Sequence, residues 1–97
     1  MKLKSIKPAN DNIHKFIATI ETEEGKLRQV KFGAKGMSDY TKNKDPQRKD
    51  RYLNRHRARE DWTQSGILTP GFWSRWVLWN LPSFSASVAD VRSRFGL

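Results

Sequence analysis

The feature that most constrains the fold is a short apolar stretch late in the chain. Its large side chains are Phe72, Trp73, Trp76, Val77 and Trp79. Thr69 and Pro70 suit the cap and first turn of a helix, and Pro82 stops one, so a helix is predicted over residues 69–80. A helix that is apolar around most of its circumference normally lies at the centre of a small domain. The rest of the chain must therefore pack around it.

Two segments before this helix alternate apolar and polar residues with a period of two. They are residues 13–22 (IHKFIATIET) and 26–32 (KLRQVKF), separated by a turn that contains Gly25. This pattern predicts an antiparallel hairpin. Residues 1–10 add a strand that ends at Pro8, which gives a three-stranded antiparallel meander within residues 1–33. An isolated hairpin is only marginally stable in water, so helices are expected to cover one face of the sheet.

A basic helix is predicted between the sheet and the tryptophan-rich helix. Asp45 and Pro46 form a cap and a first-turn proline, and we expect the helix to span residues 44–62. A polar connector at residues 34–43 would join it to the sheet. Residues 42–61 hold eight basic and four acidic side chains, so this helix carries much of the positive charge.

A C-terminal helix is predicted over residues 84–95. Its apolar side chains recur at steps of four, three and four, at Phe84, Val88, Val91 and Phe95. Ser85 or Ser87 is the expected cap, and Asp90 stands where a capping-box partner of Ser87 would stand. The predicted fold is therefore a single α+β domain, with a small three-stranded antiparallel meander followed by three helices.

The composition favours anionic partners. The 97 residues carry a formal charge of +9, which suits nucleic acid, acidic proteins or anionic surfaces. The chain has no cysteine, which excludes disulfides and thiolate metal sites. No apolar run approaches the roughly 20 residues that span a bilayer, and the N-terminus has no secretory signal. We expect a soluble intracellular protein that does not enter a membrane.

The basic helix supplies the main candidate binding surface. Four arginines recur at steps of three or four and would share one face over roughly 16 Å. A guanidinium group presents a fork of donors that matches a phosphate. The candidate nucleic-acid-binding residues are Lys42, Lys44, Arg48, Lys49, Arg51, Arg55 and Arg59. Binding through them would be mostly to phosphates, without strong sequence preference.

Two other interpretations of the basic helix remain open. Its cations could form local ion pairs with Asp50, Glu60 and Asp61 on a solvated surface, each worth a few tenths of a kcal/mol. Its basic face could also dock an acidic protein partner. The sequence does not specify an oligomeric state, and it does not separate DNA from RNA.

The tryptophan cluster allows a structural and a functional interpretation. Large aromatic side chains dominate the cores of small domains, which favours packing. The alternative is a platform on which bases stack, or an interface with another protein. Trp79 lies furthest round the helix from Trp73 and Trp76, so it is the expected partly exposed member and the candidate interface aromatic.

An enzymatic interpretation ranks third. Asn54 and His56 resemble the Asn and His of a small metal-dependent nuclease, with His14 as a third group. On a helix, however, residues two apart face different ways. We therefore predict no catalytic residue, no metal site and no cofactor.

Three segments together resemble a known family. They are FGAKGMSDYT, KDPQRKDRYLNRHRAREDW and SGILTPGFWSRWVLWNLPS, within residues 31–95. The chain resembles short, uncharacterised basic proteins encoded by large double-stranded DNA viruses, and the N-terminal strands match them only in character. The resemblance implies a viral origin, a compact domain and a genome-associated or virion role. It brings no catalytic residue. The leading hypothesis is a non-enzymatic nucleic-acid-binding protein, and the alternative is a minor virion structural or interaction module.

Overall fold

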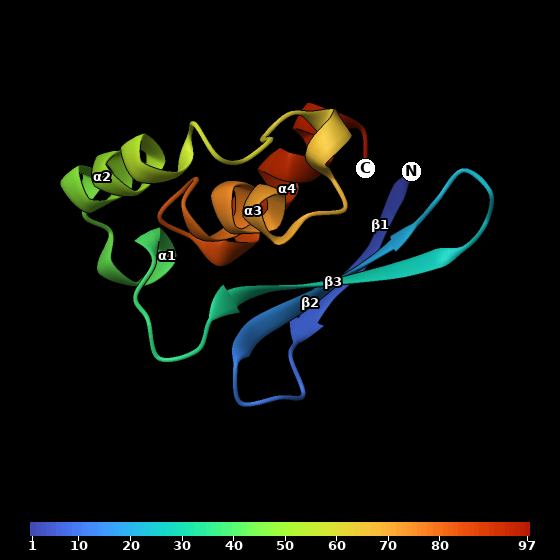
Figure 1. Cartoon of the computed structure of the whole chain (residues 1–97), viewed down its shortest axis with the longest axis horizontal. Helices are drawn as coiled ribbons and strands as arrows, with labels where there is room; N and C mark the ends of the chain where they lie inside the picture. The colour runs from blue at the N-terminus through green and yellow to red at the C-terminus, as the bar shows by residue number, and fades with distance from the viewer.

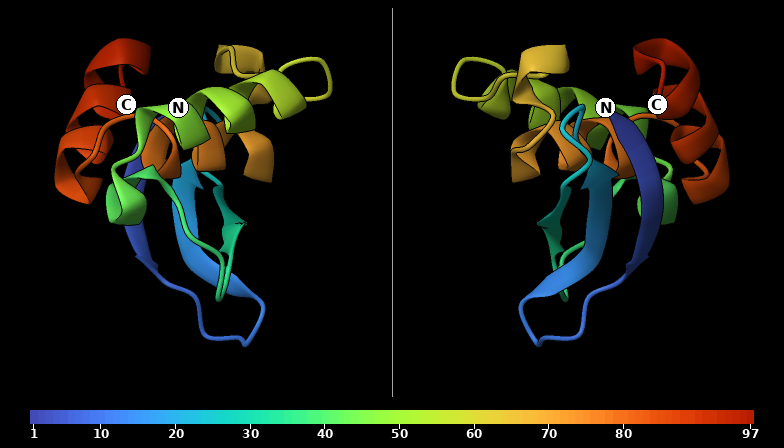
Figure 2. Two further views of the ribbon diagram at one scale, coloured as in Figure 1. Left: turned by 90° about the vertical axis from the view of Figure 1, so that its left-hand side faces the viewer. Right: turned by 90° about the vertical axis from the view of Figure 1, so that its right-hand side faces the viewer.

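The sheet lies on one side of the molecule and the helices on the other (Figures 1 and 2). The computed structural model describes residues 1–97. Strands β1 (Lys2–Pro8), β2 (His14–Glu21) and β3 (Leu27–Ala34) form an antiparallel sheet in the order β1-β2-β3. The predicted α+β fold with a three-stranded meander is confirmed.

A bulge in β1 turns its two apolar residues toward the helices. Leu3 pairs with Ile20 and Ile6 pairs with Ala18, and the register shifts between Leu3 and Ser5. Leu3 and Ile6 are three residues apart, so strict alternation would place them on opposite faces. The extra residue on β1 brings both to the inner face.

Six helical segments follow the sheet. They are α1 (Tyr40–Asn43), α2 (Pro46–His56), the 3₁₀ turn η1 (Gln64–Gly66), α3 (Pro70–Trp73), the π-helical turn η2 (Ser74–Leu78) and α4 (Phe84–Phe95). The expected connector therefore contains a helical turn, α1. The basic helix ends at His56, six residues before the predicted end. The tryptophan-rich helix begins in α geometry and ends as a π turn, in which the Trp79 amide bonds the Ser74 carbonyl.

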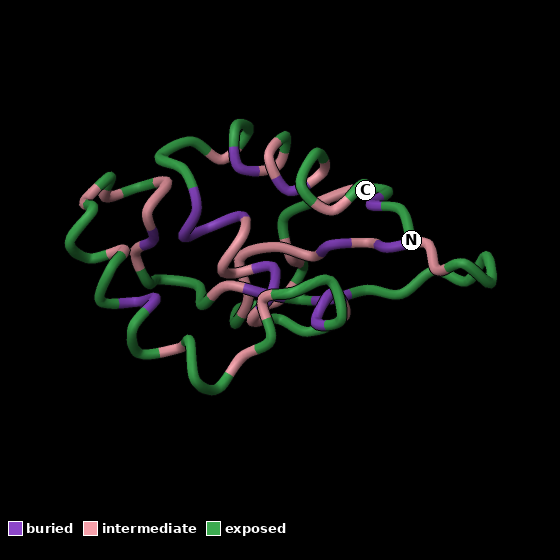
Figure 3. Tube along the Cα trace, turned by 90° about the horizontal axis from the view of Figure 1, so that it is seen from above, coloured by how far each residue is buried: buried purple, intermediate pink, exposed green.

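The tryptophan-rich helix lies at the centre, as its composition predicts. Phe72 and Trp73 are fully buried, and the Trp73 ring lies 6.4 Å from that of Phe32 on β3. The indole Nε1 of Trp73 donates to the carbonyl of Ile67 at 2.7 Å, so its polar group is satisfied inside the core. Figure 3 shows the buried positions along the interior, whereas residues 23–29 at the β2–β3 turn are exposed.

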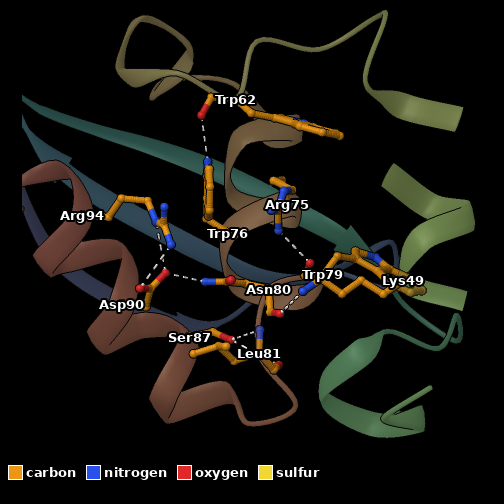
Figure 4. A network of polar contacts seen from close by, with 10 residues as sticks. All are labelled: Lys49, Trp62, Arg75, Trp76, Trp79, Asn80, Leu81, Ser87, Asp90 and Arg94. Carbon is orange, nitrogen blue, oxygen red and sulfur yellow. Dashed lines mark hydrogen bonds and ion pairs between the residues drawn. The ribbon is translucent and has the colours of Figure 1, made fainter. Parts of the chain in front are cut away.

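The end of the tryptophan-rich helix is held by α4 (Figure 4). Ser87 is fully buried and its hydroxyl accepts from the Leu81 amide at 3.0 Å. Asp90 accepts from the Asn80 side chain at 2.7 Å. The prediction that Ser85 or Ser87 caps α4 is wrong, because Ser83 is the cap and accepts from the Ala86 amide. Ser87 and Asp90 are instead used to join two helices.

The two ends of the chain lie close together in Figures 1 and 2. Arg92 on α4 donates to the Leu3 carbonyl on β1 at 2.8 Å, which ties the last helix to the first strand. None of the helices is long and apolar enough to cross a membrane.

Candidate functional site

Helix α2 begins where the sequence predicts and ends six residues before the predicted end. The Asp45 carboxylate accepts from the amides of Gln47 and Arg48, and Pro46 occupies the first turn. Beyond the helix, Glu60 accepts from His56 Nδ1 and from Trp62 Nε1, each at 2.9 Å. These two bonds join residues 60–62 to the last turn of α2, beyond the end of the helix.

Three arginines of α2 line one groove. The groove has a volume of about 500 Å³, and its lining is Met37, Ser38, Arg48, Arg51, Asn54, Arg55 and Trp79. We call it the arginine groove. The three arginine side chains are exposed, and none lies within ion-pair distance of a carboxylate. The local ion pairs that the sequence allowed are therefore not formed by these arginines.

The other predicted binding cations lie elsewhere. Lys42 is on α1 and Lys44 is its C-cap, and both are exposed but outside the arginine groove. Arg59 is exposed but follows the end of α2, so it does not continue the arginine row. The predicted face of four arginines is therefore a face of three.

Lys49, predicted as part of the binding surface, does not line the arginine groove. Its Nζ donates to the Asn80 carbonyl at 2.6 Å and lies 5.1 Å from the Tyr40 ring centre. Burial, together with repulsion from the Arg75 charge, lowers the pKa of the Lys49 ammonium. The side chain points inward and joins α2 to the end of the tryptophan-rich helix (Figure 4).

A second, inner cavity adjoins the arginine groove. Its volume is about 490 Å³, and it lies between the end of the sheet, residues 37–39, α2 and the tryptophan-rich helix. Four residues line both spaces: Met37, Ser38, Arg55 and Trp79. The inner cavity and the arginine groove therefore meet at Arg55.

Both histidines of the chain line the inner cavity. His14 Nδ1 donates to Asp11 at 3.0 Å, and His56 Nδ1 donates to Glu60 at 2.9 Å. Asp11 also accepts backbone hydrogen bonds, from His14 first, and these bonds hold the pKa of its carboxyl well below its usual range. In each ring Nε2 has no protein partner, so a neutral imidazole would present it as an acceptor.

A buried ion pair forms one wall of the inner cavity. Lys15 Nζ lies 2.6 Å from an Asp39 carboxylate oxygen, and their side chains are only 8% and 2% exposed. The same carboxylate caps α1 by accepting from the Thr41 amide at 2.9 Å. The pair therefore fixes Asp39 against the sheet, next to Met37 and Ser38, which line both spaces.

Three aromatic rings form a stack beside the inner cavity. Tyr52 lies between His56, at 4.1 Å between ring centres, and Trp79, at 4.4 Å. Burial raises the pKa of Tyr52 to about 12, and the nearby Glu60 charge adds to this effect. Trp79 is only 9% exposed, so the expectation that it is the partly exposed tryptophan is wrong. The π turn changes the direction of the Trp79 side chain, and the stacked ring of Tyr52 covers that side chain.

Within the tryptophan-rich helix the half-buried tryptophan is instead Trp76, and arginines cover it. The guanidinium groups of Arg75 and Arg94 lie 4.2 and 4.5 Å from its ring centre (Figure 4). Arg75 also lies 5.5 Å from the Trp62 ring and donates to the Trp79 carbonyl at 2.8 Å. Burial, with repulsion from Arg94 and Arg57, lowers the pKa of Arg75. Cations already occupy the Trp76 ring, so the tryptophans do not form an open platform for bases.

Only two of the three groups named in the nuclease interpretation share one space. Asn54 lines the arginine groove, whereas His14 and His56 line the inner cavity. No three His, Asp or Glu side chains lie close enough together to hold a metal ion.

Sequence reasoning missed the partners of the two histidines and the pair of Lys15 with Asp39. The spacing of four between His56 and Glu60 is a readable signal, because residues four apart are neighbours on a helix surface. Lys15 and Asp39 are 24 positions apart in the sequence, so no local sequence pattern predicts that they pair.

Comparison with known proteins identifies a family. A model of a family of unknown function, DUF5754, matches residues 4–56. The chain belongs to the DUF5754 family. The DUF5754 match includes the sheet, the connector and α2, and therefore both histidines and the three arginines of the groove. No curated protein and no solved structure matches the chain significantly.

Proposed function

We propose that this DUF5754 protein binds nucleic acid through phosphate contacts in the arginine groove, without catalysing a reaction. The observation that carries the proposal is the arrangement of Arg48, Arg51 and Arg55. They line one groove, they are exposed, and no carboxylate neutralises them. The formal charge of +9 on 97 residues adds a general attraction for polyanions.

The geometry suits a phosphate backbone. Arg48 and Arg55 are separated by roughly 10 Å along the helix axis, so the three guanidinium groups can meet several phosphates at once. Contacts of this kind position the nucleic acid but do not read its sequence. Weak sequence preference is therefore expected.

A salt titration tests the proposal. Each phosphate that the protein neutralises releases counterions, so three contacts on duplex DNA give a log–log slope of roughly −2.7. Affinity should then fall roughly 40-fold when the salt concentration rises fourfold. Duplex DNA, single strands and heparin are titrated side by side. A flat salt dependence, or no binding at low ionic strength, contradicts the proposal.

Charge reversal locates the surface. The double variant Arg51→Glu and Arg55→Glu should abolish binding and keep the fold. The matched control is Lys26→Glu with Arg28→Glu, which changes the charge equally at exposed positions near the β2–β3 turn. Equal losses from both variants would show a nonspecific charge effect and no defined groove. The single variant Arg59→Glu should have a smaller effect than Arg55→Glu.

The resemblance to basic proteins of large double-stranded DNA viruses supports a genome-associated or virion role for this binding. Detection of the protein in purified virions, together with its recovery on viral DNA after crosslinking, is the test. Absence from both places would contradict the viral part of the proposal and leave the binding part intact.

A second candidate is a docking surface for an acidic protein. Met37 is 65% exposed and borders both the arginine groove and the inner cavity, so an apolar contact is available beside the cations. Recovery of one defined protein after nuclease treatment, lost in the Arg51 and Arg55 double variant, would favour this function.

A further inference from the structure

We propose that the inner cavity receives one unpaired base of the strand held in the arginine groove, so that the protein prefers single-stranded nucleic acid. This inference rests on the proposed function. It adds a binding site for a nucleoside to a surface that would otherwise contact only phosphates.

The first argument is continuity. The arginine groove and the inner cavity share Arg55, Met37 and Ser38, so a chain that runs along the groove passes the mouth of the cavity. An unpaired Arg55 at this junction can hold a phosphate while the attached base turns inward. The cavity volume of about 490 Å³ falls within the range for small-molecule sites, about 300–1,000 Å³.

The second argument is the chemistry of the lining. An unstacked base needs a flat apolar contact and polar groups for its edge. Both faces of Tyr52 are occupied, but the stack ends at the half-buried ring of His56, which lines the cavity. Leu78 and Pro70 add apolar walls.

The two histidines supply hydrogen-bonding capacity. Each uses Nδ1 to donate to a carboxylate, so in the neutral ring the remaining Nε2 accepts. Because the ring face of His56 is the stacking surface, Nε2 of His14 is the acceptor left for the edge of the base, and it suits an exocyclic amino group such as that of adenine.

The third argument concerns the form of the nucleic acid. In a duplex the bases are paired and stacked, and turning one into a cavity costs a few kcal/mol. A single strand avoids most of that cost. Removing one base–aromatic contact typically weakens single-strand binding about 5- to 100-fold, and the expected preference for single strands over duplex is of this size.

The first test uses the unmodified protein. His14 and His56 are the only histidines of the chain and both line the cavity, so their ring NMR signals report on it directly. The probes are inorganic phosphate, ribose 5-phosphate, adenosine monophosphate and a short oligoadenylate strand. Adenosine monophosphate and the strand should shift both sets of ring signals, and the two phosphates without a base should not. Equal shifts with ribose 5-phosphate would overturn the base site.

The second test fills the cavity. Ala34 is exposed at the end of β3 and lines the cavity, so Ala34→Trp should occupy its rim. The matched control is Leu27→Trp, at the exposed opposite end of the same strand. Ala34→Trp should reduce single-strand affinity about 5- to 100-fold and leave duplex affinity and its salt slope unchanged.

The outcomes separate the two proposals. Salt-dependent binding of duplex and single strands with equal affinity, with unshifted histidine signals, would overturn the base site and leave the phosphate groove standing. Failure to bind any polyanion would overturn the proposed function, and the base site with it.

Discussion

The ammonium of Lys49 lies 2.6 Å from the backbone carbonyl oxygen of Asn80, so a basic residue of α2 fastens the end of the tryptophan-rich helix. This contact separates two uses of positive charge on one helix. Arg48, Arg51 and Arg55 face the groove and solvent, whereas Lys49 faces the core. Replacing each kind of residue should therefore change a different property of the protein.

Lys49→Met should lower stability and leave polyanion binding almost unchanged. The substitution removes the donor to the Asn80 carbonyl, and an unsatisfied buried acceptor costs about 1–3 kcal/mol. Urea unfolding measures the loss. Lys42→Met, on the exposed side of α1, is the control and should change stability little. The affinity of Lys49→Met for polyanions should fall no further than that of the variant Lys26→Met. Unchanged stability with a marked loss of affinity would contradict the inward role of Lys49.

The inward position of Lys49 shows what the sequence could have revealed. Lys49, Tyr52, Leu53 and His56 follow steps of three, one and three, which is the spacing of one buried helix face. The charge of Lys49 favoured an outward assignment, but a long side chain can cross an apolar surface and place its ammonium on a carbonyl. At this position, helical periodicity predicts the orientation of the side chain better than residue type does.

The sheet and the central helix were predictable because their signals are local. Alternation in residues 13–22 and 26–32 gives the inner face of Ala18, Ile20, Val30 and Phe32, all of which are buried. The end of α2 was not predictable in this way. Residues 57–62 contain no glycine or proline, so no helix-breaking residue marks the end, and beyond it Glu60 bonds both His56 and Trp62.

The candidate site was predictable only in part. The arginines of the groove follow from helical spacing, but the inner cavity depends on how residues 37–39 meet the sheet and α2. The π turn at Ser74–Leu78 also has no clear sequence signal, yet it sets where Trp79 lies. Contacts between segments distant in sequence create the inner cavity, so local sequence patterns do not predict it.

The wild type should lose stability at alkaline pH, and the variant Tyr52→Phe should not show this loss. Burial raises the pKa of Tyr52 to about 12 from its usual value of 10.0. The stability that comes from keeping Tyr52 neutral is present in full below pH 10, and it is lost as the pH rises through 12. Relative to Tyr52→Phe, the wild type should lose roughly 2 kcal/mol across this window.

Urea unfolding at several alkaline pH values measures this difference. The tyrosinate absorbance of the wild type, minus that of Tyr52→Phe, gives the titration of Tyr52 directly. A midpoint near 10 would show that the ring is solvated and that the stack with Trp79 is open.

Lys15→Met should destabilise the protein strongly, because it leaves the Asp39 carboxylate buried without its cation. Breaking a buried pair by removing one partner costs about 3–5 kcal/mol. The double variant Lys15→Met with Asp39→Asn should recover most of the loss, since it removes the charge and asparagine still caps α1. Unfolding free energies of the wild type, both single variants and the double variant give the coupling. A loss below about 1 kcal/mol for Lys15→Met would indicate a solvated pair.

Gly33→Ala should destabilise the protein more than Gly36→Ala. Both glycines have positive φ, 79° and 87°, so a side chain at either position costs about 1–2 kcal/mol of backbone strain. A Cβ at Gly36 would meet nothing within 4 Å, whereas at Gly33 it would lie 2.9 Å from a methyl group of Leu78. The close approach of β3 to the tryptophan-rich helix therefore needs glycine at position 33. Thermal and urea unfolding of the two variants measure the difference, and equal losses would show that the Leu78 side chain can move aside without cost.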